Sequence, residues 1–190
     1  GDPMDDHSHG THVAGTIGAI RNNNTGVAGV TPYVRLMALK FLGTDNSGFT
    51  SDAVELLNYV HMMKQENGVD VKLTNNSWGG GSESQSLQAA IEASNQNGIL
   101  FVAAAGNDSE NLDQYSQYPA NYNIDNIISV ASTNSNDALS SFSNYGSDVD
   151  LAAPGSSILS TIPDSAYGFK SGTSMAAPHV AGALSLLFSS

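Results

Sequence analysis

Short apolar runs alternate with longer amphipathic stretches in this sequence, and that alternation limits the fold more than any other feature. The apolar runs cover residues 34–41, 69–74 and 99–105, and helix-like patterns cover residues 51–65 and 84–95. Because the run over residues 99–105 is apolar without a break, we expect it in a parallel sheet covered on both faces. The pattern therefore predicts an α/β fold with a mainly parallel sheet and helices on both faces.

The predicted helix over residues 51–65 has recognisable ends. Thr50 or Ser51 is the expected N-cap, and Asp52 and Glu55 lie near the positive end of the helix dipole. Gly68 follows the last turn, where a glycine often ends a helix.

The second half of the sequence is expected to complete the same domain. Strands are predicted over residues 127–131, 149–152 and 158–162. A closing helix over residues 174–188 has small or apolar residues at nearly every position, so it is expected to be buried on most sides. We therefore expect one domain over residues 1–190.

Charge and composition exclude several classes of function. Eighteen acidic against six basic residues give a net charge of -12, which would repel a nucleic acid backbone. No apolar run is long enough to span a bilayer, so no membrane partner is expected. Without cysteine there is neither a disulfide framework nor a thiolate site. The acidity is explained by solubility or by carboxylates that bind Ca²⁺.

Three histidines, His7, His9 and His12, stand close together near the start of the sequence. Imidazole is both the usual general base near neutral pH and a common metal ligand. A metal-dependent hydrolase is one hypothesis, but Thr11 occupies the aspartate position of the H-x-H-x-D-H pattern and no H-E-x-x-H occurs. The other hypotheses are a general base and a group of solvated or capping histidines.

Ser174 stands at the start of the predicted closing helix, where free peptide N–H groups and the helix dipole favour an oxyanion. The G-x-S-x-G motif of α/β-hydrolases is absent because Ala176 follows where the second glycine should stand. That argues against a lipase or esterase of that fold. Taken alone, Ser174 is equally an ordinary helix N-cap.

Asn107 follows the buried run over residues 99–105, at the expected carboxyl end of a strand. Its amide NH₂ could stabilise a developing alkoxide, and Gly106 could let a substrate approach the backbone. An asparagine is also common in ordinary turns.

Four motifs in this order closely resemble the subtilisin-like serine proteases: HGTHVAGT from His9, SWGG from Ser77, AAAGN ending at Asn107, and GTSMAAPHVAG around Ser174. The resemblance implies a serine endopeptidase in which His9 is the general base, Ser174 the nucleophile and Asn107 the oxyanion donor. It also implies an extended peptide or unfolded protein as substrate, and a secreted or extracytoplasmic location.

The resemblance further implies a groove that pairs with the substrate backbone. Two segments would line the groove and its primary specificity pocket, and a third would form the opposite rim. For Trp78, core packing is the alternative role. The residues are Ser77, Trp78, Gly79 and Gly80, then Ala104, Ala105 and Gly106, and on the opposite rim Gly48 and Phe49.

A structural Ca²⁺ site is implied by similarity to the calcium loop of the family. The Asn23 side chain and the carbonyls of Ile20, Thr25 and Val27 would be ligands, although Arg21 resembles an insertion that disturbs the Ile20 position. Asp2, Asp5 and Asp6 are candidates for a second Ca²⁺ site, and a solvated acidic turn is the alternative.

The sequence departs from the family pattern at the triad aspartate. The family places this residue in a D-[ST]-G motif upstream of the catalytic histidine, and only eight residues precede His9 here. We therefore expect a partial domain, truncated before the triad aspartate and shortly after the Ser174 helix, with a sheet incomplete at both ends. A propeptide or the missing N-terminal segment is a possible partner. The alternative function is a catalytically inert fragment or a calcium-binding pseudoprotease.

Overall fold

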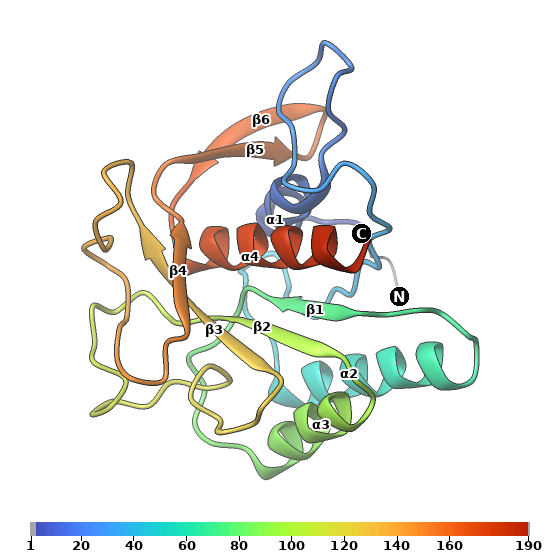
Figure 1. Cartoon of the computed structure of the whole chain (residues 1–190), viewed down its shortest axis with the longest axis vertical. Helices are drawn as coiled ribbons and strands as arrows, with labels where there is room; N and C mark the ends of the chain where they lie inside the picture. The colour runs from blue at the N-terminus through green and yellow to red at the C-terminus, as the bar shows by residue number, and fades with distance from the viewer. Residues whose placement is uncertain (1–2, 190) are drawn as a thin grey trace.

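The computed structural model describes residues 3–189 and contains a central sheet of four parallel strands (Figure 1). The strands lie in chain order: β1 (Leu73–Asn76), β2 (Leu100–Ala104), β3 (Ile127–Thr133) and β4 (Leu151–Pro154). Helices α1 (His9–Gly18) and α4 (Thr173–Phe188) cover one face of this sheet, and α2 (Thr50–Gln65) and α3 (Gln85–Gln96) cover the other. The predicted α/β class is confirmed.

Strand β2 divides the core into two layers. Val102 and Ala104 pack with α1 and α4, whereas Phe101 and Ala103 face α2 and α3. Alternate residues of a strand point to opposite faces, so an apolar residue is needed at every position of a strand covered on both sides. This confirms the prediction made from the unbroken apolar run over residues 99–105.

An antiparallel hairpin lies beside α1, and only its first strand was predicted. Strand β5 (Ile158–Ile162) pairs with β6 (Ala166–Lys170). The hairpin is fixed to α1 by hydroxyl groups: Ser160 donates to the His12 carbonyl and Thr161 donates to the Thr11 carbonyl. Because β6 ends just before α4 begins, the hairpin brings the start of α1 close to the start of α4.

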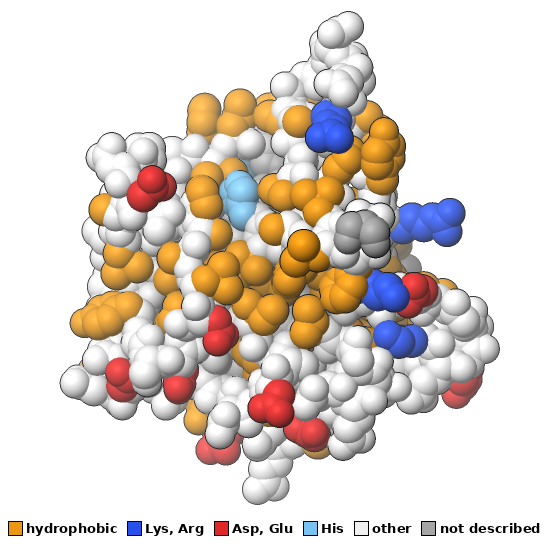
Figure 2. Space-filling view, viewed as in Figure 1, with side chains coloured by type: hydrophobic (Ala, Val, Ile, Leu, Met, Phe, Trp, Pro, Cys, Tyr) orange, Lys and Arg blue, Asp and Glu red, His pale blue; other side chains and the backbone are white. Residues whose placement is uncertain are grey.

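Residues 34–41 are not a strand, contrary to prediction. The described part of the chain gives this segment no strand partner, and β1 is an edge strand that pairs only with β2. Apolar sequence is not sufficient for a strand, since the ladder of hydrogen bonds needs a neighbour. Leu36 and Met37 consequently remain partly exposed. Figure 2 shows apolar side chains gathered over α4 and β1 on the viewed face.

Most of the other elements differ from prediction by one or a few residues at their ends. Phe49 is the N-cap of α2 instead of Thr50 or Ser51, because Thr50 already has helical geometry. β1 begins at Leu73 because the Val69 and Val71 N–H groups close the turns that follow α2. β4 runs from Leu151 to Pro154, two residues later than predicted. Among the residues that the structure describes, no helix is long and apolar enough to cross a membrane.

Candidate active site

His9 is the first residue of α1, and Asp5 holds the turn that leads into this helix. Ser8 occupies the N-cap position in a left-handed conformation (φ 79°) and its side chain does not cap. The Asp5 carboxylate replaces it: it accepts hydrogen bonds from the N–H groups of His7 and Ser8 at 2.9 Å, and from the Thr11 N–H and hydroxyl at 2.7 Å. Asp5 therefore fixes the position of His9.

Ser174 is the second residue of α4 and is tied to the segment after β1. Its hydroxyl donates to the Ser77 carbonyl at 3.2 Å, and the Ser77 hydroxyl donates to the Ser174 carbonyl at 2.8 Å. The Ser174 N–H lies in the first turn of the helix, where peptide N–H groups have no intrahelical partner. A hydroxyl group and a peptide N–H at a helix start thus occur in one residue.

The side-chain amide of Asn107 is oriented by Thr173. Asn107 Oδ1 accepts from the Thr173 N–H at 2.8 Å and from the Thr173 hydroxyl at 3.1 Å. The same hydroxyl accepts from the Gly106 N–H at 3.1 Å. Because both donors bind the oxygen, the NH₂ group is the end of the amide that is available as a donor.

These three segments, far apart in the sequence, meet at one pocket. An open pocket of about 310 Å³ includes His9, Asn107 and Ser174 in its wall. An imidazole, a hydroxyl and an amide donor at one surface are the groups that acyl transfer requires. The other lining residues are Asn46, Lys170, Ser171, Gly172 and Met175.

The electrostatics of the pocket keep His9 neutral. The pKa of His9 is lowered to about 4, mainly by burial and then by the positive charges of Lys170 and the neighbouring His7, and Asp5 opposes them. Within the described chain no carboxylate pairs with the His9 ring, and both Asp5 oxygens bind the turn. His9 is therefore available as a base at neutral pH, but a weak one.

The predicted acidic cluster has other roles in the structure. Asp5 accepts the four hydrogen bonds described above, and Asp6 forms an ion pair with Lys40 at 2.6 Å. Asp2 lies outside the described residues. Over residues 3–189 no group of three His, Asp or Glu side chains is arranged to hold a metal ion.

The three histidines do not converge on one point. The rings of His7 and His9 are 6.4 Å apart between centroids. His12 is fully buried, and its Nε2 donates to the carbonyls of Ile158 and Gly168 at 2.9 and 3.1 Å. A zinc site of the metal-dependent hydrolase kind has no support in this geometry.

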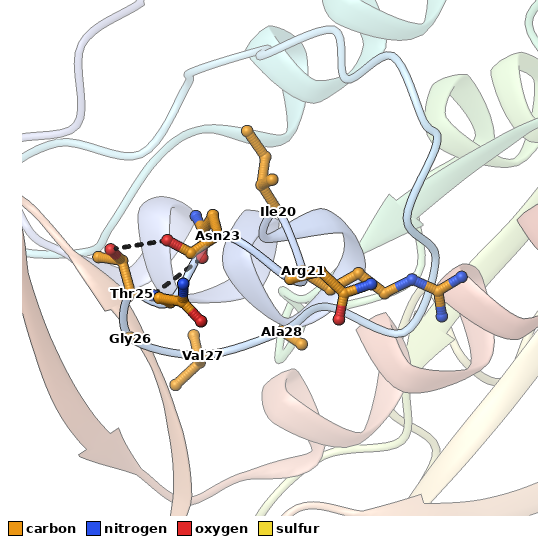
Figure 3. Close-up of a pocket in the computed structure, with 9 residues that line it drawn as sticks. Ile20, Arg21, Asn23, Thr25, Gly26, Val27 and Ala28 are labelled. Atoms are coloured by element: carbon orange, nitrogen blue, oxygen red, sulfur yellow. Dashed lines mark hydrogen bonds between the residues drawn. The ribbon is translucent and has the colours of Figure 1, made fainter.

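The predicted calcium loop lines a second pocket, formed by residues 20–28 (Figure 3). Figure 3 shows the Asn23 side chain turned toward Thr25, whose N–H it binds at 3.1 Å. The oxygen donors of the loop are of the kind that Ca²⁺ prefers, but residues 20–28 contain no carboxylate and include Arg21. The loop therefore offers a neutral and incomplete set of ligands.

The predicted substrate-binding segments differ in how much of their surface and backbone remains available to a substrate. Trp78 packs edge-on between Phe41 and Phe101, with ring centroids 5.3 and 6.4 Å away, as its core-packing interpretation expects. The Gly80 N–H donates to the Tyr118 carbonyl at 3.2 Å, so one edge of this segment is already paired. Phe49 is 76% exposed.

Gly106 has a backbone conformation and surroundings that only a glycine fits. Its φ is +110°, and a Cβ there would meet Asn144 Nδ2 at 2.2 Å and Gln117 Oε1 at 2.3 Å. The glycine is needed for the turn and for close packing of these amides. Ala104 and Ala105 are buried beside it.

Sequence reasoning missed two contributors to the site. Asn144 is fully buried, accepts from the N–H groups of Asp108 and Glu110, and donates to the Ala105 carbonyl, so it shapes the turn that carries Asn107. Lys170 lines the pocket from the end of β6. Its place four residues before Ser174 was the only available signal.

Comparison with known proteins gives a consistent result. A model described as the subtilase family matches residues 1–190. Subtilisin DY from Bacillus licheniformis is 44% identical over 186 residues, which are 97% of this chain and 65% of that protein. Thermitase from Thermoactinomyces vulgaris is 43% identical over 98% of this chain and 63% of its own length. The crystal structure of a cold adapted subtilisin-like serine proteinase superposes with a TM-score of 0.84 at 38% identity, covering 98% of this chain and 63% of that one.

The chain spans less than two thirds of the length of these relatives. The major intracellular serine protease of Bacillus subtilis (strain 168) is also 43% identical, over 96% of this chain and 56% of that protein. Membership of the family therefore does not by itself decide the cellular compartment.

Proposed function

Because this chain belongs to the subtilase family, we propose that it carries the His and Ser catalytic groups of a serine endopeptidase. Ser174 is the nucleophile, His9 the general base, and Asn107 with the Ser174 N–H the oxyanion hole. The observation that carries the proposal is the meeting of these three residues at one pocket, from segments far apart in the sequence.

The first half of the reaction forms an acyl-enzyme. His9 takes the hydroxyl proton of Ser174 as its oxygen attacks the peptide carbonyl and forms a C–O bond. The Ser174 hydroxyl exchanges its bond to the Ser77 carbonyl, which is long at 3.2 Å, for one to His9. The C–N bond then breaks, and the His9 proton leaves with the amine. Water repeats these steps to release the acid.

The oxyanion is stabilised by two donors that are already in place. Thr173 donates two hydrogen bonds to the side-chain oxygen Oδ1 of Asn107, so the side-chain NH₂ group is left to bind the substrate. The Ser174 N–H, at the positive end of α4, is the second donor. Such preorganised donors contribute most to acyl transfer because they need no reorganisation during the reaction.

The rate of peptide hydrolysis that we expect depends on whether a carboxylate pairs with His9. No described carboxylate fixes the imidazole or stabilises the imidazolium. Loss of the aspartate alone costs subtilisin about 3 × 10⁴ in kcat, and the oxyanion hole and binding still leave measurable catalysis. We therefore expect slow peptide hydrolysis by this chain.

Labelling with a fluorophosphonate tests the proposal directly, because it needs an activated serine but not rapid turnover. Ser174 is expected to be labelled, and His9→Ala is expected to slow the labelling. Ser171 is a matched control: it lines the same pocket, but its hydroxyl accepts from the Ser157 N–H at 2.8 Å. Equal labelling of Ser171, or none at Ser174, would favour the alternative of an inert pseudoprotease.

We also propose that the loop over residues 20–28 binds Ca²⁺ weakly, through Asn23 Oδ1 and the backbone carbonyls of Ile20, Thr25 and Val27. Their neutral oxygens support the assignment, and the lack of a carboxylate limits affinity. Millimolar Ca²⁺ is expected to raise the Tm, and chelation to reverse the change. Asn23→Ala is expected to remove this response, and an unchanged Tm in EDTA would exclude the site.

A further inference from the structure

Lys170 is the one formally charged side chain in the wall of the active-site pocket over the described residues. The eight lining residues include no carboxylate and no second Lys or Arg. The residue ends β6, where it pairs with Ile158, and it is partly buried. A cation in this place is unexpected in a chain with a net charge of -12 and only six Lys and Arg residues.

No carboxylate among the described residues forms an ion pair with Lys170. The ion pairs over residues 3–189 are Lys40 with Asp6 and Lys72 with Asp70, and neither involves Lys170. Lys170 pairs with Ile158 in the β5–β6 hairpin, and the Ile158 carbonyl accepts a hydrogen bond from His12 of α1. The end of β6 therefore lies beside the helix that begins at His9, and Lys170 lines the His9 side of the pocket.

The proposed mechanism requires a particular part of the substrate to occupy the His9 side of the pocket. His9 transfers its proton to the leaving amine, so the residues that follow the scissile bond must lie next to the imidazole. The segment that begins at Ser77 contacts Ser174 instead, through the two hydrogen bonds between these residues. The acyl part of the substrate thus lies toward Ser77 and the leaving part toward Lys170.

We propose that Lys170 selects substrates that carry a carboxylate on the leaving-group side of the scissile bond. An acidic side chain there would form an ion pair with the ammonium group of the partly buried Lys170, where such a pair is stronger than between fully exposed side chains. It would also offset the positive field at His9 and so increase the basicity of the imidazole. The inference rests on the proposed function, and it assigns the active site a preference for acidic residues on the leaving-group side of the scissile bond.

Two quenched peptides that differ only in Asp or Asn at the first residue after the cleaved bond test the proposal. A second pair places the same change at the following residue. We expect kcat/KM to be about three- to tenfold higher for Asp in at least one pair, the range of one partly screened charge pair. Lys170→Met is expected to remove the preference and Lys170→Glu to reverse it. Lys72→Met is the control, because it removes the same charge remote from the pocket.

Binding to the Ser174→Ala variant separates this inference from the proposed function, because it requires no catalysis. The Asp peptide is expected to bind more tightly than the Asn peptide, and the difference is expected to shrink with added salt. Labelled Ser174 with no Asp preference in binding or cleavage would overturn the role of Lys170 and leave the protease proposal intact. A preference that persists in Lys170→Met would also overturn it. Absent labelling would count against the proposed function alone.

Discussion

Replacing Asp5 by Asn is expected to destabilise the chain by about 1–2 kcal/mol at pH 7. Partial burial raises the pKa of Asp5, but hydrogen bonds from Thr11, His7 and Ser8 outweigh it and lower the pKa from 3.8 to about 2. At 1.36 kcal/mol per pKa unit the change corresponds to roughly 2.4 kcal/mol, and solvent screening of this partly exposed group reduces the figure. With about 2.1 cal/mol/K of unfolding entropy per residue over 190 residues, the Tm is expected to fall by about 3–5 °C.

The pH dependence of this loss is its sharpest test. A depressed carboxyl pKa stabilises the fold above pH 3.8, and the contribution disappears as the pH falls from about 4 to about 2. Urea unfolding of both proteins at pH 6 and pH 3 measures it. Asp6→Asn is the control, since its exposed pair with Lys40 contributes less than about 1 kcal/mol. Equal stability of Asp5→Asn and the parent at pH 6 would refute the reasoning.

The same variant tests whether Asp5 replaces the triad aspartate. Both of its oxygens bind the turn and neither binds the His9 ring. Asp5→Asn keeps one side-chain oxygen as an acceptor for the turn, so it is expected to slow fluorophosphonate labelling of Ser174 only slightly. A residue that acted as the triad aspartate would instead lose about 10⁴-fold. A loss of that size would show that Asp5 serves His9 directly.

Three further perturbations have defined outcomes. Burial lowers the pKa of His9, His12 and His61 in the folded state, so the unfolded state takes up protons first as the pH decreases. At pH values below about 6.5 the free energy of unfolding is therefore expected to decrease, by up to about 1.4 kcal/mol per pH unit for each histidine. Equal urea midpoints at pH 7 and pH 5 would contradict this. Asn107→Ala is expected to slow peptide hydrolysis by about 10²–10³, the cost measured when subtilisin itself loses such a donor, and an unchanged kcat would exclude the residue from the oxyanion hole. Asn144→Ala is expected to cost about 2–5 kcal/mol, because it leaves the buried partners of its amide unpaired, and thermal unfolding measures this loss.

Features written in local sequence were predictable. The unbroken apolar run identified β2, and small apolar residues identified α4, because each pattern reports burial of that segment alone. Sequence motifs also indicated three candidate site residues, and the structure brings all of them to one pocket: His9, Asn107 and Ser174.

Features that depend on a distant partner were not predictable. Residues 34–41 have the composition of a strand but find no neighbour to pair with among the described residues, and β6 forms because it folds back on β5. The hydrogen bonds of Asn144 to the turn after Ala105 join segments about 40 residues apart, so its own surroundings resemble an ordinary polar loop. The place of Lys170 in the pocket wall depends on α1 and α4 beginning side by side, which its own sequence surroundings do not show.

The open side of β1 has a practical consequence for anyone who handles this chain. Over residues 3–189, β1 pairs on one side only, and an unpaired strand edge presents a row of unsatisfied N–H and C=O groups. Apolar side chains of α4 such as Leu186 and Phe188 are exposed near it. When two molecules meet at such surfaces, backbone pairing and apolar burial act together, so aggregation is expected. Association of this kind depends on how often two molecules collide, so dilution is expected to keep the protein dispersed better than cooling, since apolar association weakens only gradually in the cold.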